Sequence, residues 1–83
     1  MYKVYKQTEL AKFVKQELKK RNYTTVSSFA RDMNLDVEKL GKYLRGYSKF
    51  DLHYFMALVE GLELEVTTLY QYVYRNEKSK GLL

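Results

Sequence analysis

The sequence predicts an all-α domain of five helices. Apolar residues recur at spacings of three and four along most of the chain, which is the repeat of a helix with one buried face. The 83 residues contain no proline, which would end or kink a helix, and no low-complexity linker. We therefore expect one domain over residues 1–83, with a core at about 8–72 and flexible ends at 1–7 and 75–83.

The first helix is expected at about residues 8–21 and the second at about 26–33. Thr8 and Thr25 are their predicted caps, because a threonine hydroxyl at the start of a helix accepts a hydrogen bond from a free backbone N–H. The residues expected to face the core are Leu10, Phe13, Val14 and Leu18 in the first helix and Phe29, Ala30 and Met33 in the second.

The third helix is expected at about 37–45 and the fourth at about 52–61. Asp36 and Asp51 are the predicted caps, since a carboxylate is stabilised by the positive end of the helix dipole. Gly46 follows the third helix, where a left-handed glycine commonly ends a helix. The predicted inner faces consist of Leu40, Tyr43 and Leu44, and of Leu52, Phe55, Met56, Val59 and Leu62.

The fifth helix is expected to begin near Glu65 or Val66 and to end at about Tyr72. Its end, YQYVY at 70–74, also alternates with a period of two, so a strand that pairs with residues 2–5 is the alternative. The residues that mark the helical spacing are Val66, Leu69, Tyr70 and Val73.

Residues 29–46 have the spacing of two short helices around a tight turn. The positions that define the pattern are Phe29, Ala30, Met33, Asn34, Leu35, Asp36, Leu40, Tyr43 and Gly46. Here the chain resembles, without a gap, the helix-turn-helix of the phage lambda repressor and Cro-like (Xre-type) regulators. The resemblance covers about residues 8–70 and implies a lambda-repressor-like five-helix bundle. Asn34 replaces the family's usual glycine at a turn of positive φ, which asparagine tolerates.

Four positions depart from the family's pattern. Val26 replaces a common glutamine, and Leu44 replaces a polar residue. Gly41 lies inside the third helix, at a cost of ~1 kcal/mol relative to alanine. Glu63 stands at a usual glycine, so Gly61 is expected to terminate the fourth helix instead.

The resemblance implies that the third helix enters the major groove of DNA with its N-terminus first. The base-reading positions carried over are Val37, Glu38, Lys39 and Lys42. The phosphate-contacting positions are Thr25, Arg45, Tyr47, Ser48 and Lys49, with Lys3 and Lys6 as an N-terminal arm. A solvated N-terminus is the alternative to the arm.

Glu38 is unusual on a surface that meets a polyanion. Its carboxylate could accept a hydrogen bond from cytosine N4, with Val37 against a thymine methyl and Lys42 on guanine O6/N7. The alternative is local, because Glu38 and Lys42 have the i, i+4 spacing of a helix ion pair worth ~0.2–0.5 kcal/mol.

Charge is unevenly distributed along the chain. Residues 1–24 hold seven Lys or Arg and two Glu, whereas residues 51–74 hold four acidic residues and no Lys or Arg. A basic front and an acidic back indicate a polyanion bound on one side. The alternative is that the lysines form ordinary solvated helix faces.

These observations favour a sequence-specific regulator of transcription that binds double-stranded DNA as a homodimer, of the repressor type found in phages, plasmids and mobile elements. The alternative is a protein-interaction module on the same fold. Nine tyrosines also allow single-strand binding by stacking. A seam of Tyr70, Tyr72 and Tyr74 would form either the dimer surface or a contact with the first helix.

Other chemistries have little support in the sequence. No cysteine is present, His53 is the only histidine, and the four glycines are scattered, so we expect no enzyme activity, catalytic residue, metal or cofactor. We expect no small-molecule ligand either. The longest apolar run is 55–59, far below the ~20 residues of a membrane span, and the start of the chain lacks a signal-peptide segment. A cytoplasmic location is therefore expected, without a membrane partner.

Overall fold

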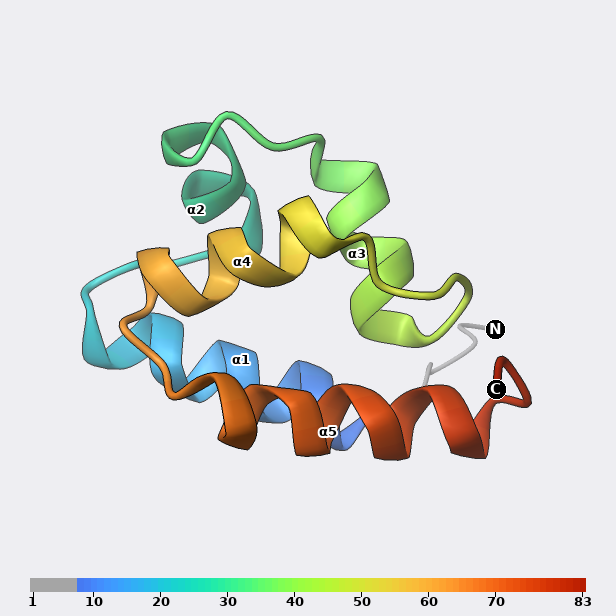
Figure 1. Ribbon diagram of the computed structural model, residues 1–83. Helices are drawn as coiled ribbons and strands as arrows, with labels where there is room; N and C mark the ends of the chain where they lie inside the picture. The colour runs from blue at the N-terminus through green and yellow to red at the C-terminus, as the bar shows by residue number, and fades with distance from the viewer. Residues whose placement is uncertain (1–7) are drawn as a thin grey trace, which may run out of the picture.

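The computed structural model describes residues 8–83, which form five α-helices and no strand (Figure 1). The all-α prediction is thus confirmed for this part of the chain. The helices begin at or within one residue of their predicted starts, and they are α1 (Glu9–Lys20), α2 (Val26–Asp32), α3 (Val37–Arg45), α4 (Leu52–Gly61) and α5 (Val66–Ser79).

Four helices begin with the predicted side-chain caps. Thr8 accepts from the backbone N–H of Ala11 at 3.0 Å, and Thr25 accepts from Ser28 at 3.1 Å. The carboxylates of Asp36 and Asp51 do the same for α3 and α4, at 3.0 Å and 2.8 Å. Each cap satisfies a donor that the first turn of a helix leaves unpaired, so polar residues set where these short helices begin.

The fourth helix ends at Gly61, as predicted, but Gly61 is not the left-handed residue that reverses the chain. Glu63 itself adopts the left-handed conformation, with φ 52°. The backbone N–H of Leu64 then reaches the carbonyl of Val59 at 2.9 Å. Gly61 serves packing instead, because a Cβ there would lie 2.8 Å from ring carbons of Phe29.

α5 continues to Ser79 instead of ending near Tyr72, and residues 70–74 are helical, so the strand alternative is wrong for them. Residues 2–5 lie outside the described residues. The extension is held by two buried polar residues, of which one binds the α3–α4 connection and the other the last turn of α3. Glu77 Oε2 accepts from the backbone N–H of Phe50 at 2.7 Å, and Asn76 Nδ2 donates to the carbonyl of Tyr43 at 3.4 Å.

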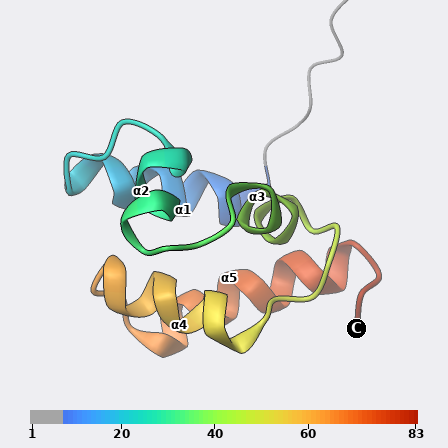
Figure 2. The same cartoon turned by 90° about the horizontal axis from the view of Figure 1, so that it is seen from above.

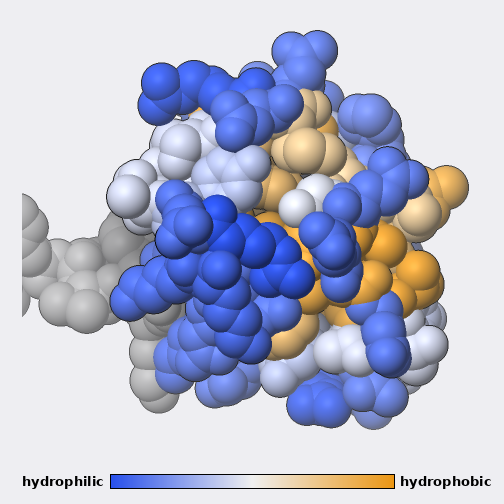
Figure 3. Space-filling model, turned by 90° about the vertical axis from the view of Figure 1, so that its left-hand side faces the viewer, coloured by the Kyte–Doolittle hydropathy of each residue, from blue (hydrophilic) through white to orange (hydrophobic). Residues whose placement is uncertain are grey.

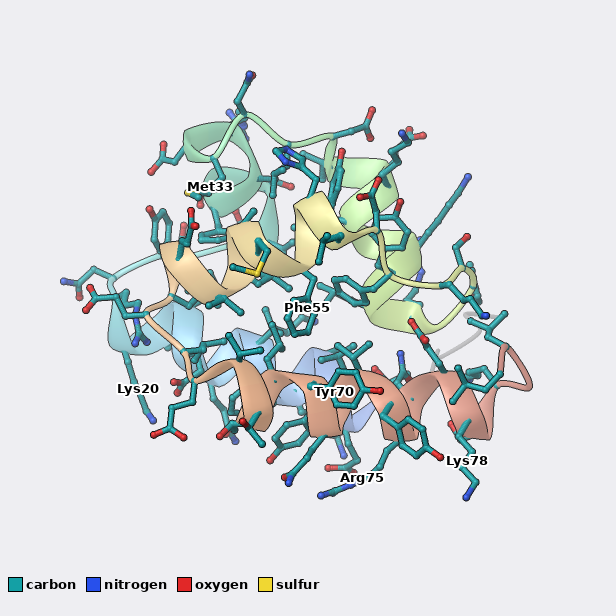
Figure 4. All side chains as sticks on the ribbon, in the orientation of Figure 1. Lys20, Met33, Phe55, Tyr70, Arg75 and Lys78 are labelled. Carbon is teal, nitrogen blue, oxygen red and sulfur yellow. The ribbon has the colours of Figure 1, made fainter. Side chains whose placement is uncertain are left out.

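The helices form two layers, with α1, α2 and α3 on one side and α4 and α5 on the other (Figure 2). The rings of Phe13 and Tyr72 stack 4.2 Å apart where α1 meets α5. Phe55 points from α4 toward α5 (Figure 4). The largest fully buried side chains of this core are Phe29, Leu10, Leu40, Leu58, Leu62, Leu69 and Val14.

Three residues predicted to face inward lie on the surface instead. Leu52, Val66 and Tyr70 are 73%, 50% and 57% exposed. Leu52 and Val66 are the first residues of α4 and α5, before the helix has turned toward the core. Tyr70 follows Val66 by one turn and therefore shares its outer face.

Candidate nucleic-acid interface

α3 is fixed to the rest of the molecule at both ends. The Tyr54 hydroxyl accepts from the backbone N–H of Asp36 at 3.1 Å, just before the helix. The Thr8 hydroxyl donates to the carbonyl of Leu44 at 2.7 Å, in the last turn. Leu40 and Leu44 are buried between these points. Because both ends and the inner face are held, the outer side chains of α3 project from a rigid base.

The outer face of α3 is open to solvent. All four residues predicted to read bases are exposed, and so is Arg45 in the last turn. Gly46 ends the helix in the left-handed conformation, with φ 78°, as predicted. Asn34, in the connection from α2, also has the expected positive φ of 58°.

A groove of about 690 Å³ runs along one flank of α3, between this helix, α1 and the start of α2. Several predicted site residues meet there, and the lining consists of Thr8, Ala11, Lys15, Val26, Val37, Glu38, Gly41, Leu44, Arg45 and Tyr47. Its inner surface is mainly aliphatic, and its charged members lie on facing helices. Lys39 and Lys42 belong to α3 but do not line the groove.

Arg45 occupies a defined place beside this groove. Its Cζ lies 5.3 Å from the centroid of the Tyr47 ring, in a cation–π contact. A Cβ at Gly41 would lie 3.3 Å from Arg45 Nη1 and 3.5 Å from Nη2, so the guanidinium covers the bare backbone of α3 at that point. Its side chain forms no ion pair or hydrogen bond with residues 8–83.

Glu38 and Lys42 are not paired with each other among the described residues. Every ion pair in that part of the chain involves α1: Lys12 with Glu9, and Lys20 and Arg21 with Glu17. The ion pair between Glu38 and Lys42, the alternative to base reading, is therefore not formed among residues 8–83, and the Glu38 carboxylate faces solvent.

Lysines of the first helix are expected from the sequence to contribute as a group where they face a DNA backbone, but the sequence did not show which of them do so. Lys15 lines the main groove, and Lys15 and Lys19 both line a second hollow of about 390 Å³ next to the start of α2. Neither forms an ion pair with any residue from 8 to 83. Their i, i+4 spacing, with no glutamate one turn away, was the signal that could have identified them.

Thr25 also lines the second hollow, but its hydroxyl is engaged in the cap of α2 and in a 3.1 Å hydrogen bond with the Ser28 hydroxyl. Tyr23 lies along the same hollow. A side-chain hydrogen bond to Asp32 raises the pKa of the Tyr23 phenol, and desolvation and the charge of Asp32 act in the same direction. All three effects favour the neutral form of this tyrosine.

Ser48 and Lys49 lie in the connection from α3 to α4. Lys49 is exposed and Ser48 is half-buried. The connection is anchored through Phe50, whose ring stacks on Tyr43 at 5.1 Å and whose N–H is bound by Glu77. The backbone at Lys49 is therefore held in place relative to α3, while its side chain extends into solvent. The two predicted arm residues, Lys3 and Lys6, lie outside the described residues.

Residues 8–83 contain no cluster of three His, Cys, Asp or Glu side chains that could hold a metal ion. None of the helices in this part of the chain combines the length and the apolar character that crossing a bilayer requires. No family model, curated protein or solved structure matches the sequence. Function is therefore inferred from the residues of this surface and their geometry.

Proposed function

We propose that the protein is a sequence-specific double-stranded DNA-binding regulator of transcription, of the repressor type found in phages, plasmids and mobile elements. In this proposal α2 and α3 form the helix-turn-helix of a lambda-repressor-like bundle, and residues 37–45 are the recognition helix. The observation that carries it is the open outer face of α3, which is held at both ends and carries Lys39, Lys42 and Arg45.

The dimensions of α3 suit the major groove. An α-helix with its side chains is about 10–12 Å in diameter, and the major groove of B-DNA is about 12 Å wide, so the exposed helix α3 fits the groove. With its N-terminus first, the helix would place Val37 against a thymine methyl and Glu38 within reach of a cytosine N4 amine. Lys42, one turn further, would donate to guanine O6 or N7.

Affinity in this proposal comes mainly from lysines on the backbone phosphates. Lys49 lies beyond the C-terminal end of α3, and Lys15 lies across the groove on α1, so the two cations flank the reading face. A carboxylate at Glu38 lowers affinity for every duplex, but it lowers affinity most where no base donor meets it. Glu38 therefore increases selectivity between sequences while it lowers overall affinity for DNA.

The separation of charge between the two layers supports binding on one side. Residues 51–74, which include four acidic residues and no Lys or Arg, form α4 and the first part of α5. These helices are on the opposite side from α1 and α3 (Figure 2). Figure 3 shows one face of the molecule with a dense hydrophilic cluster beside a hydrophobic patch that is bordered by further hydrophilic side chains. A polyanion would be attracted to the α1–α3 layer and repelled by the other.

The partner on the α5 side is a second copy of the chain. Val66, Tyr70 and Tyr74 are exposed at i, i+4 and i+8 on α5, and the two tyrosine rings stack 6.2 Å apart. Figure 4 shows Tyr70 on the outer side of this helix. Tyr72 and Val73 face inward, and the Tyr72 ring stacks on Phe13 of α1. Of the three tyrosines, Tyr72 therefore contacts the first helix, whereas Tyr70 and Tyr74 are available to a second copy of the chain. A two-fold dimer through this face would read a two-fold operator.

The test begins with selection of bound duplexes from a random pool at near-physiological salt, followed by two variants. Lys42→Ala should relax the preference at one base position, by about 10-fold against the wrong base. Lys49→Ala should weaken binding to every sequence alike and reduce the salt slope by about 1. An unchanged preference in Lys42→Ala would remove that residue from the base-reading set.

One observation favours the second candidate, a protein-interaction module. The groove beside α3 has an aliphatic lining that includes Ala11, Val26 and Val37, which would also accept an apolar partner helix. Such a module would show no salt-dependent affinity for random duplex DNA, so the same titrations separate the two candidates.

A further inference from the structure

Gly41 has no conformational reason to be glycine. It lies in the middle of α3 with an ordinary helical backbone, where alanine would favour the helix more. What its missing side chain leaves room for is the Arg45 guanidinium. The three atoms closest to a Cβ built at position 41 are Nη1, Nη2 and Cζ of Arg45, at 3.3, 3.5 and 3.6 Å.

Tyr47 holds the same guanidinium from another direction, with its ring centroid 5.3 Å from Arg45 Cζ. Gly46, with φ 78°, turns the chain so that Tyr47 can reach back beside the helix, and the Tyr47 N–H donates to the Lys42 carbonyl at 2.9 Å. An arginine side chain is otherwise flexible and loses considerable entropy when it binds. Contacts with the Gly41 backbone and the Tyr47 ring hold the guanidinium in place before binding and so reduce that loss of entropy.

We propose that Arg45 is the principal base-reading side chain and that it reads guanine, while Gly41 and Tyr47 are positioning residues that hold its guanidinium. The inference deepens the proposed DNA-binding function and rests on it. It also revises the sequence-based expectation, in which Arg45 contacts a phosphate.

The planar donor fork of arginine fits two kinds of acceptor pair, guanine O6 with N7 and the two free oxygens of a phosphate. The position of the guanidinium favours guanine. It lies over Gly41, the fifth of nine residues in α3, whereas phosphates would lie at the ends and flanks of a helix inserted into the groove.

Glu38 supports the same choice. It lines the groove with Arg45, and a carboxylate so placed repels a phosphate but accepts a hydrogen bond from cytosine N4. The Glu38 carboxylate can accept from cytosine and the Arg45 guanidinium can donate to guanine, so together they complement the two bases of G·C pairs. The side chain of Arg45 has no carboxylate partner among residues 8–83, so its donors are available to a base.

The experiment uses the full chain and the duplex selected from a random pool. Each guanine of the selected site is replaced in turn by 7-deazaguanine, which lacks the N7 acceptor, and each phosphate by an uncharged methylphosphonate. The wild type should lose about 10-fold in affinity or more at one guanine, and Arg45→Ala should bind the unmodified and the 7-deaza duplex equally. Arg45→Lys keeps one donor but lacks the planar fork, so it should discriminate less than the wild type. Because lysine keeps the charge, Arg45→Lys should retain the salt dependence on random DNA.

The positioning residues have their own readout, the affinity ratio between the guanine and the 7-deazaguanine duplex. Tyr47→Phe keeps the ring and should keep the ratio, whereas Tyr47→Ala and Gly41→Leu should reduce it several-fold with the protein still folded by circular dichroism.

Three outcomes overturn the inference: a selected site without guanine, full discrimination by Arg45→Ala, or an Arg45→Ala effect that only a methylphosphonate reproduces. The last would make Arg45 a phosphate contact. Failure of the proposed function is a separate result, since it appears as the absence of any salt-dependent duplex binding by the wild type.

Discussion

Among residues 8–83, three residues other than glycine hold the backbone in the left-handed region: Asn22 at φ 64°, Asn34 at φ 58° and Glu63 at φ 52°. Asparagine adopts this conformation more readily than most residues, so the first two could be anticipated from residue type. Glu63 could not, because a glutamate there is strained by its Cβ. Each of the three follows a helix and lets the chain reverse within a few residues.

Replacing Glu63 by glycine should therefore stabilise the protein. The relief of left-handed strain outweighs the added freedom of the unfolded chain, so the free energy of unfolding should rise by about 0.5 kcal/mol. The thermal midpoint should rise by about 2–4 °C. The matched control is Glu60→Gly, which places the same change inside α4 and should lower the free energy of unfolding by about 1 kcal/mol. Equal effects of the two substitutions would show that Glu63 is not strained.

Residue identity alone did not reveal what Gly61 and Gly41 do. Both have ordinary helical backbones, and the reason for each glycine is a side chain that packs on it: Phe29 from α2 on Gly61, and Arg45 from one turn further along α3 on Gly41. The first contact joins helices far apart in sequence, so no local pattern could predict it.

At the scale of the elements, polar caps and apolar spacing predicted where the helices begin, but not where α5 ends. The segment RNEKSK at 75–80 has no apolar period, which suggested a flexible end. It is helical through Ser79 because Asn76 binds a carbonyl in the last turn of α3 and Glu77 binds a backbone N–H of the α3–α4 connection. Polar contacts of this kind leave no periodic trace in the sequence.

The Glu77 carboxylate should therefore be a main anchor of that connection. Glu77→Ala leaves the half-buried Phe50 N–H without its acceptor, and should lower the free energy of unfolding by about 1–3 kcal/mol. Glu77→Gln keeps an acceptor oxygen of the same reach and should cost less than half as much. Urea denaturation measures both. Equal losses in the two variants would mean that the hydrogen bond contributes little and that packing of the side chain dominates.

The candidate site could be predicted from the sequence only where it lies on a single helix. The outer positions of α3 follow from its own period, and four predicted residues, Val37, Glu38, Arg45 and Tyr47, meet in one groove. The contribution of Lys15 depends on how α1 crosses α3, which is a tertiary contact. The resemblance to helix-turn-helix regulators includes the first helix, but it did not identify Lys15 as the residue that faces α3.

At the scale of the whole molecule, the two layers divide the surface into a basic side and a side with exposed apolar residues. The second side should mediate dimerisation through α5. Tyr70→Lys should weaken the dimer by about 10-fold or more, because a central aromatic contact is lost and two charges are brought together. Gln71→Lys adds the same charge to an exposed neighbour and should have a smaller effect. Sedimentation equilibrium measures the dimer dissociation constant of both variants. An unchanged dissociation constant in Tyr70→Lys would exclude this face of α5 as the dimer interface.

The central claim is that the side carrying α3 binds duplex DNA, and titration of the protein on random-sequence duplex at about 50 mM and about 200 mM salt tests it most directly. Two or more phosphate contacts predict an affinity that falls by at least about 10-fold between these conditions. An affinity that does not change with salt, or no binding at either concentration, would contradict the claim and favour a protein partner in the groove beside α3.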